Sequence, residues 1–347
     1  MNPSPTSPLP VTLLSGFLGA GKTTLLNALL SAHNEGRFAI IENEFGAVNI
    51  DSQLIARQNG GIIELTNGCI CCTVNDDLVR GLEELHARRA SGELSFDWIV
   101  IETTGLADPG AVAQTFFAAP ELRDTFMLDG IITVVDALHA AQQLDEHPLV
   151  ARQIGFADRL LIAKSDSATA ATLAALAKRL SAINARAAQF VLINGRLPDG
   201  TLPPILGIGG FDLDNSLLAA PFLRYAPVNA SASALGSRKR PRAHADNIRS
   251  VLLEGGDVDL AAVDQFVETL INEFADKLLR YKGILALTDE PRRLIFQGVQ
   301  RVAGFDYGTP WEIGETRSSR IVLIGKDLPV AELEARFAAT AAKAPPP

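Results

Sequence analysis

A glycine-rich segment near the N-terminus constrains this chain more than any other feature. Residues 16–24 read Gly-Phe-Leu-Gly-Ala-Gly-Lys-Thr-Thr and follow the apolar run 11–15. An apolar strand, a glycine-rich loop and a Lys-Thr pair that opens a helix are typical of a P-loop. The glycines let backbone N–H groups turn toward phosphate oxygens, and the positive end of the helix dipole adds to them. We therefore expect a phosphate site formed by Gly16, Gly19, Ala20, Gly21, Lys22, Thr23 and Thr24.

Lys22 and Thr23 have separate roles in such a loop. The lysine contacts the β- and γ-phosphates and serves catalysis, whereas the Thr23 hydroxyl is a ligand of Mg²⁺. The nearest alternative is a Rossmann dinucleotide site, but its glycine spacing differs and it gives Lys22 no role. The segment therefore predicts a nucleotide bound together with Mg²⁺.

Apolar runs and helix-length segments alternate along the first part of the chain. Buried strands that alternate with helices indicate a parallel sheet with helices on both faces. The predicted class is therefore α/β, a P-loop NTPase sheet with flanking helices. The predicted strands span residues 11–15, 38–42, 98–102, 130–136, 159–163 and 190–193, and the helices include 22–32 and 168–182.

The pattern changes after a polar, proline-containing stretch at residues 226–247. Strands are expected at 248–254, 283–287, 294–302 and 320–324, with helices at 260–279 and 330–342, which indicates a smaller α+β domain. We therefore divide the chain into a disordered N-terminus (1–10), a P-loop domain (11–225), a linker (226–247) and a C-terminal domain (248–347).

The composition limits the partners of the chain. Its 31 Lys and Arg residues stand against 40 Asp and Glu, which gives a net charge of -9 and argues against general nucleic-acid binding. No apolar run approaches the roughly 18 residues of a membrane span, and the N-terminus does not resemble a secretory signal. We expect a cytoplasmic protein that binds neither nucleic acid nor membrane.

The segment Ile162-Ala163-Lys164-Ser165-Asp166 follows a predicted strand and resembles the Asn-Lys-x-Asp loop that recognises guanine. An Asp carboxylate can accept from two N–H groups of guanine, which adenine does not offer. The Lys164 stem lies over the base in this interpretation, and Ala163 takes the place of the Asn. The alternative is a strand-ending turn with one charged pair. Asp166 favours GTP over ATP.

A second apolar strand, residues 98–102, ends in Glu102 and is followed by Gly105. Glu102 is expected to hold Mg²⁺ through water or to orient the attacking water, and the Gly105 N–H is expected to sense the γ-phosphate. The alternative is a buried strand that merely ends in an acidic turn. Asp108 and Pro109 then predict the N-cap and first residue of a helix.

The 3 cysteines stand close together, at Cys69, Cys71 and Cys72. They cannot form a disulfide framework, and their thiolates suit Zn²⁺ or Cu(I) better than Mg²⁺. They fill only part of a tetrahedral zinc shell, which fits a site that passes its metal on. Buried small hydrophobic residues and a redox pair are the alternatives. Glu42 and Glu44 are further candidate ligands, with an acidic solvent-exposed loop as their alternative.

The motifs described above, in their order along the chain, resemble those of the CobW-type GTP-binding proteins, which belong to the SIMIBI class of P-loop GTPases. Within that family the chain most resembles the YjiA-like branch. The likeness covers nearly the whole chain. It rests on residues 16–24, 42–46 (Glu-Asn-Glu-Phe-Gly), 67–72 (Asn-Gly-Cys-Ile-Cys-Cys), 102–109 (Glu-Thr-Thr-Gly-Leu-Ala-Asp-Pro), 164–166, 275–283 and 294–299.

The resemblance implies slow, metal-responsive GTP hydrolysis and delivery of Zn²⁺, or of Co²⁺ in cobalamin synthesis, with Cys-x-Cys-Cys as the metal-binding signature. Two positions depart from the family. Ala47 replaces an acid that often follows the Phe-Gly of residues 45–46, and His244 is alone where many members carry a His-rich tract. A single transferable metal site is therefore expected, without storage of several ions.

The expected function is that of a GTP-hydrolysing metallochaperone that couples metal transfer to GTP hydrolysis. Its expected partners are GTP or GDP and a metal-requiring client protein, and it could form a homo-oligomer. One alternative is a non-catalytic sensor or scaffold that responds to GTP and metal. The other is an ATP-dependent small-molecule kinase.

Overall fold

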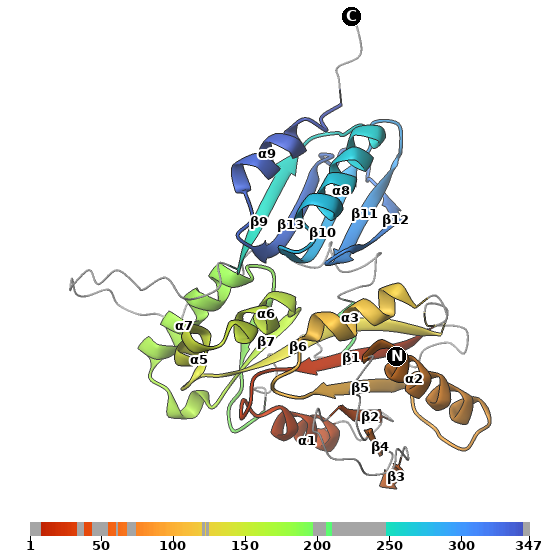
Figure 1. Cartoon of the computed structure of the whole chain (residues 1–347), viewed down its shortest axis with the longest axis vertical. Helices are drawn as coiled ribbons and strands as arrows, with labels where there is room; N and C mark the ends of the chain where they lie inside the picture. Colours follow the sequence, from red (N-terminus) through yellow and green to blue (C-terminus); the bar gives the residue numbers. More distant parts are fainter. Residues whose placement is uncertain are drawn as a thin grey trace, which may run out of the picture.

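The computed structural model describes residues 8–32, 38–43, 55–59, 62–67, 74–119, 122, 125–196, 206–209 and 248–342. These residues form two sheets, one in each half of the molecule (Figure 1). The disordered N-terminus expected at 1–10 is too long, since Leu9 and Pro10 are buried in the first strand and pair with Phe126 and Met127. The linker at 226–247 lies outside the described residues and stays a prediction. None of the described helices has the length and apolar character that crossing a membrane requires.

The first sheet has eight strands in the order β3-β4-β2-β5-β1-β6-β7-β8. Neighbouring strands are parallel, except that β3 pairs antiparallel with β4 at one edge. This arrangement confirms the predicted fold class. The strands are β1 (Leu9–Ser15), β2 (Phe38–Asn43), β3 (Ile55–Asn59), β4 (Ile62–Asn67), β5 (Trp98–Thr103), β6 (Phe126–Asp136), β7 (Arg159–Ala163) and β8 (Ala188–Val191).

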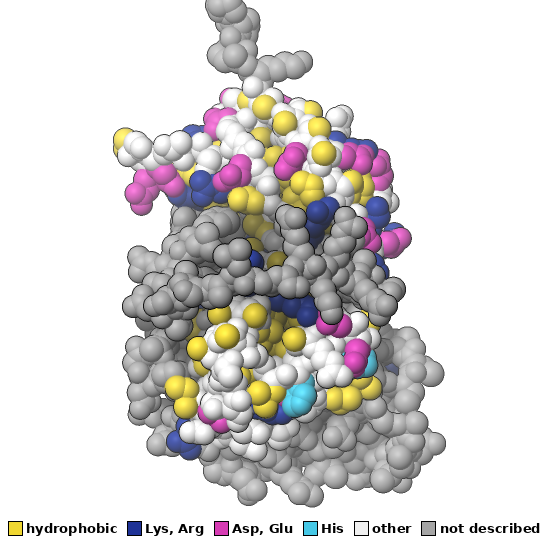
Figure 2. Space-filling view, turned by 90° about the vertical axis from the view of Figure 1, so that its left-hand side faces the viewer, with side chains coloured by type: hydrophobic (Ala, Val, Ile, Leu, Met, Phe, Trp, Pro, Cys, Tyr) yellow, Lys and Arg dark blue, Asp and Glu magenta, His cyan; other side chains and the backbone are white. Residues whose placement is uncertain are grey.

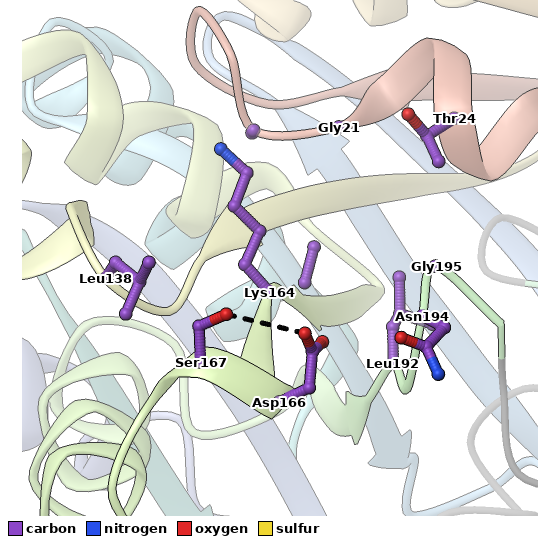
Figure 3. Close-up of a pocket in the computed structure, with 11 residues that line it drawn as sticks. Gly21, Thr24, Leu138, Lys164, Asp166, Ser167, Leu192, Asn194 and Gly195 are labelled. Atoms are coloured by element: carbon purple, nitrogen blue, oxygen red, sulfur yellow. Dashed lines mark hydrogen bonds between the residues drawn. The ribbon is translucent and has the colours of Figure 1, made fainter.

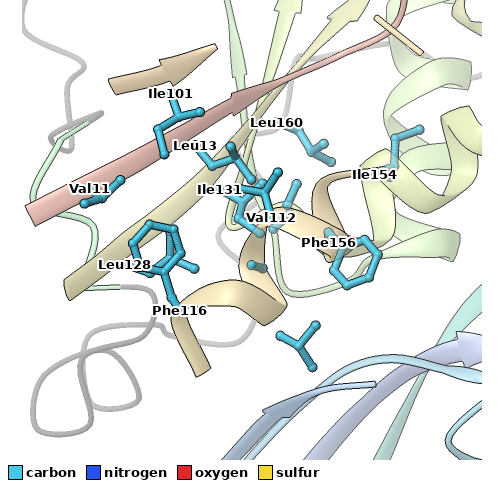
Figure 4. Packing of buried hydrophobic residues seen from close by; sticks show 14 of the residues in the cluster. Val11, Leu13, Ile101, Val112, Phe116, Leu128, Ile131, Ile154, Phe156 and Leu160 are labelled. Carbon is cyan, nitrogen blue, oxygen red and sulfur yellow. The ribbon is translucent and has the colours of Figure 1, made fainter. Parts of the chain in front are cut away.

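Helices cover both faces of this sheet. On one face, α1 contributes Leu25 and Leu26 to a buried cluster, and on the other α2, α3, α6 and α7 pack over a larger core. In that core, side chains of β1, β5 and β6 meet those of α3 and α6 (Figure 4). The helices are α1 (Lys22–Ala32), α2 (Val74–Ala90), α3 (Pro109–Ala118), α5 (Ala140–Glu146), α6 (Pro148–Phe156) and α7 (Ala170–Ile183).

The second sheet is antiparallel, with its five strands in the order β12-β11-β10-β13-β9. Two helices cover one of its faces and enclose a separate apolar core. Acidic and basic side chains are interspersed over this domain on the face in Figure 2, so the described side chains form no patch of one charge there. The elements are β9 (Ile248–Gly255), α8 (Leu260–Phe274), β10 (Leu278–Ala286), β11 (Arg292–Val299), β12 (Val302–Pro310), β13 (Ser319–Lys326) and α9 (Val330–Ala338).

Three details of the C-terminal half differ from the sequence-based prediction. The helix expected at 260–279 ends at Phe274, because Leu278 and Leu279 belong to β10 and are buried in two different cores. The strand expected at 294–302 is a hairpin, β11 and β12, whose turn has Gln300 at a φ of 50°. The helix expected at 330–342 ends at Ala338.

The two sheets are joined through α6. Apolar residues of the second sheet, among them Leu279 and Ile324, belong to the same core as Ile154 and Phe156 of α6. Beside them, Arg280 forms an ion pair of 2.8 Å with Asp158, and both side chains are 7% exposed. Burial alone raises the pKa of Asp158, but Arg280 and the Ile131 N–H outweigh it and hold that pKa below its usual value.

We expect Arg280→Met to lower the free energy of unfolding at pH 7 by about 3–5 kcal/mol, because it leaves a buried carboxylate without its ion-pair partner. The lowered pKa means that this stabilisation is present above about pH 4 and is lost as the pH falls through the lowered value. Urea unfolding at several pH values measures both effects.

Arg301→Met is the matched control, since Arg301 pairs with Asp276 at 2.6 Å but the two side chains are 64% and 85% exposed. It should cost less than about 1 kcal/mol. Equal losses in the two variants would contradict a structural role for the buried pair.

Candidate functional site

The P-loop connects β1 to α1 and depends on three glycines with positive φ. Gly16, Gly19 and Gly21 have φ values of 142°, 72° and 102°, which L side chains rarely adopt. At Gly16 space is also lacking, because a Cβ atom there would lie 2.4 Å from the Val134 carbonyl oxygen on β6. The loop can therefore take this curled path only with glycine at these positions.

Lys22 is the first residue of α1 and turns its side chain back into the loop. It is 9% exposed, and its Nζ donates to the Gly16 carbonyl oxygen at 3.0 Å. Burial lowers the pKa of Lys22, and the Glu102 carboxylate partly offsets this effect. The loop thus encloses a positive charge, as expected for a site that binds phosphate.

Thr23, in the first turn of α1, contacts Glu102 near the end of β5. The Thr23 Oγ1 donates to a Glu102 carboxylate oxygen at 3.1 Å, although the two residues are far apart in sequence. Parallel pairing of β1 with β5 explains the contact: the P-loop leads from the carboxyl end of β1 to the first turn of α1, which carries Thr23, and Glu102 lies at the adjacent carboxyl end of β5. A hydroxyl and a carboxylate are hard oxygen donors, and this donor set fits Mg²⁺.

Gly105 follows β5 and lies directly against the P-loop. A Cβ atom on Gly105 would come within 2.5 Å of the Leu18 backbone nitrogen. The same loop ends at Asp108, whose carboxylate accepts from the Gly110 N–H at 2.9 Å. The predicted N-cap of α3, followed by Pro109, is therefore confirmed.

A cavity of about 240 Å³ opens beside the P-loop. Lys164 extends toward the loop at Gly21, while Asp166 lies on the opposite side of the cavity from that loop (Figure 3). The structure thus brings the predicted phosphate and base residues together. The cavity is lined by Ala20, Gly21, Thr24, Leu138, Ala163, Lys164, Asp166, Ser167, Leu192, Asn194 and Gly195.

Lys164 connects the cavity to the P-loop. Its Nζ donates to the Gly19 carbonyl oxygen and to the Asp136 carboxylate, each at 2.8 Å. Burial by itself raises the pKa of Asp136, but the hydrogen bonds from Lys164, His139 and two backbone N–H groups lower it overall. Asp136 therefore acts as an anionic anchor for Lys164 as well as a cap for the turn that follows β6.

Five lining residues were not among the sequence predictions: Leu138, Ser167, Leu192, Asn194 and Gly195. Asn194 and Gly195 have φ values of 50° and 74° and form a tight turn in which Ile193 and Arg196 exchange two backbone hydrogen bonds. The Asn-Gly pair directly after a predicted strand was a signal for this turn. Ser167 donates to the Asp166 carboxylate at 3.4 Å.

The expected metal site lies outside the described residues for the most part. This applies to Glu44, Ala47 and all of Cys69, Cys71 and Cys72. The backbone of Glu42 is described on β2, in register with Glu102 of β5. Within the described ranges, no group of three or more His, Cys, Asp or Glu side chains could hold a metal ion.

We expect Gly16→Ala to weaken nucleotide binding by at least about tenfold, because the methyl group forces the P-loop away from β6. Titration of a fluorescent guanine nucleotide measures the affinity. Gly92→Ala is the control: Gly92 has a φ of 78° but nothing within 4 Å of an added Cβ. This control should lower stability without changing nucleotide affinity, and equal losses of affinity would contradict the assignment.

Comparisons with known proteins agree over nearly the whole chain. Residues 10–191 match the family model of the CobW/HypB/UreG nucleotide-binding domain, and residues 249–341 match that of the cobalamin synthesis protein cobW C-terminal domain. The zinc chaperone YjiA of Escherichia coli is 41% identical over 338 residues, which cover 96% of this chain and 98% of YjiA. The zinc chaperone CobW of Pseudomonas aeruginosa is 33% identical over 360 residues, covering 92% and 88% of the two chains.

A solved structure shows the same architecture. The crystal structure of Zn(II)-bound YjiA GTPase from E. coli superposes with a TM-score of 0.75 at 38% sequence identity, and the match covers 97% of this chain and 100% of that one. The resemblance predicted from the motifs is thereby confirmed. The chain belongs to the CobW/HypB/UreG family of P-loop GTPases.

Proposed function

We propose that this protein binds and hydrolyses GTP with Mg²⁺ and couples the hydrolysis to transfer of Zn²⁺, or of Co²⁺, to a client protein. The observation that carries the proposal is the hydrogen bond between Thr23 and Glu102 beside the enclosed Lys22 amine. The bond brings the hydroxyl that follows the P-loop next to a carboxylate near a strand end, and these are the two groups that hold Mg²⁺ in nucleoside triphosphate hydrolases of this kind.

We assign separate roles in GTP hydrolysis to the described residues. The P-loop N–H groups and Lys22 bind the phosphate oxygens and compensate their charge. Thr23 and Glu102 would hold Mg²⁺, which supplies further compensation of negative charge when bound. The alternative role of Glu102 is to orient the attacking water, and the Gly105 N–H, packed against the P-loop, is the candidate sensor of the γ-phosphate.

The cavity beside Lys164 is the proposed guanine site. Its volume and its place next to Gly21 and Thr24 support this assignment. The Asp166 carboxylate would accept from the two guanine N–H groups, and the Lys164 stem would lie along the ring. Ala163 stands where the guanine loop of other GTPases has Asn, and Asn194 contributes an amide to the same cavity.

Zinc binding is proposed for the thiolates of Cys69, Cys71 and Cys72, with Glu42 and Glu44 as further ligands. The support comes from the softness of thiolate ligands and from the relatives that are named zinc chaperones. β4 ends at Asn67, two residues before Cys69 in the sequence, and Asn67 pairs with Asn43 at the carboxyl edge of the sheet. The nucleotide residues occupy the same edge, which favours coupling of the two sites.

We expect Asp166→Asn to reduce the preference for GTP over ATP by about 1–3 kcal/mol, because it replaces an acceptor with a group that leaves a guanine N–H unpaired. Competition of GTP and ATP for a fluorescent nucleotide measures the preference. Asp264→Asn, which removes an exposed carboxylate on α8, is the charge-matched control. An unchanged preference in Asp166→Asn would show that another group recognises the base.

Cys71→Ser should lower Zn²⁺ affinity by at least about tenfold, or 1.4 kcal/mol, because a hydroxyl is a poor substitute for a thiolate. In the wild type, a non-hydrolysable GTP analogue should change the Zn²⁺ affinity, and Zn²⁺ must change the affinity for the analogue by the same factor. Metal titrations with and without the analogue test both statements.

Cys71→Ser also supplies the control, since its affinity for GTP without metal should equal that of the wild type. Coincident zinc titrations of the wild type with and without the analogue would mean that the two sites are uncoupled. The chaperone mechanism would then fail, while the GTPase assignment would stand.

A further inference from the structure

Helix α6 contains a buried polar residue that the proposed catalytic groups do not include. Gln153 is 1% exposed. Its Nε2 donates to the carbonyl oxygens of Gly105 and Ala107, each at 3.1 Å. Both neighbouring acceptors are carbonyl oxygens, so the amide nitrogen must face them and the orientation of this side chain is fixed.

The other half of the amide is less well satisfied. Gln153 Oε1 is buried and accepts no hydrogen bond from any residue that the structure describes. A buried acceptor without a partner costs free energy, which an apolar side chain of similar size would avoid. A buried amide oxygen without a hydrogen-bond donor is rare enough in folded proteins that we expect the glutamine to have a role other than filling space. The two hydrogen bonds from Gln153 Nε2 to the loop after β5 indicate what that role is.

The same loop is held at further points. Arg152, next to Gln153 on α6, bonds the Asp108 carboxylate through Nε at 2.9 Å. On the opposite side Gly105 touches the backbone of Leu18 in the P-loop. The loop is therefore clamped between the P-loop and α6, and the bond from Gln153 restricts rotation at Gly105.

We propose that Gln153 is a positioning residue for GTP hydrolysis, which holds Gly105 and Ala107 so that the loop can read the γ-phosphate. The proposal rests on the GTPase function proposed above. It makes Gln153 act through the loop, without contact to the nucleotide. Its effect should therefore appear with GTP, which carries the γ-phosphate, and should be small with GDP, which does not.

Gln153→Leu removes both donors and keeps the side-chain volume close to that of the wild type. We expect its kcat for GTP to fall by about tenfold, and its preference for a non-hydrolysable GTP analogue over GDP to fall by a similar factor. Its affinity for GDP should change by less than about threefold. Loss of folding alone lowers all affinities together and leaves the preference unchanged.

Gln189→Leu is a closely matched control. Gln189 Nε2 also donates two hydrogen bonds, to Ala177 O at 3.2 Å and Ser181 Oγ at 2.8 Å, and its Oε1 is likewise buried without a partner among the described residues. This control should lower stability and leave the preference for the GTP analogue unchanged. An equal effect of the two variants would overturn the proposal.

Gln153→Glu keeps the test decisive if the leucine variant does not fold. Burial raises the pKa of the introduced carboxyl group, and only its neutral form can donate to Gly105 O or Ala107 O. The kcat of this variant relative to the wild type should therefore rise as the pH falls from about 8 to about 6. A flat ratio across this range would overturn the proposal.

The two proposals fail in different ways. If the wild type does not hydrolyse GTP, the proposed function is wrong. If the wild type hydrolyses GTP and Gln153→Leu keeps the preference for the GTP analogue over GDP, the function stands and the role of Gln153 is wrong.

Discussion

Parallel pairing of β1 with β5 on one side and β6 on the other is the constraint on which the site depends. The carboxyl ends of adjacent parallel strands meet at one edge, so residues from distant parts of the sequence become neighbours there. Lys22 begins α1 directly after the P-loop, Glu102 is the penultimate residue of β5, and Asp136 ends β6. The hydrogen bond of Thr23 with Glu102 depends on the pairing of β1 with β5, and that of Lys164 with Asp136 on the pairing of β6 with β7, because no local sequence feature brings these residues together.

Helix α6 contacts both the loop at the carboxyl edge of the first sheet and the second sheet. Gln153 and Arg152 hold the loop after β5, and three residues further along the helix the Phe156 carbonyl oxygen accepts from Arg280 of β10 at 3.1 Å. Gly155 packs so closely on Leu279 that a Cβ atom there would lie 2.7 Å from the Leu279 Cδ1. The same helix therefore contacts both the loop after β5 and the C-terminal sheet through closely packed residues.

Sequence reasoning succeeded where a pattern has a local physical cause. The P-loop glycines, the strand that carries Glu102 near its end and the Asp108-Pro109 cap each follow from backbone geometry or capping, and each is present, although the strand ends at Thr103, one residue later than predicted. The hairpin of β11 and β12 was missed because its turn, at Gln300 and Arg301, lacks the Gly or Asn that mark such turns. Gln153 was missed because its role comes from contacts with residues 48 and 46 positions away, which no periodicity reveals.

Lys22 and Lys164 explain how a protein with a net negative charge can bind phosphate. Lys22 Nζ donates to Gly16 O and Lys164 Nζ to Gly19 O, so each amine is already hydrogen-bonded to the P-loop. The buried Lys22 and the solvent-exposed Lys164 are thus both held at the loop before an anionic ligand arrives, so that binding requires little reorganisation of these side chains. Burial of Lys22 strengthens its attraction to phosphate by lowering the local dielectric, while the Glu102 carboxylate partly offsets the lowering of the Lys22 pKa by burial. A net charge of -9 over the whole chain is therefore compatible with a phosphate site, because the site depends on a few enclosed donors and not on the overall charge.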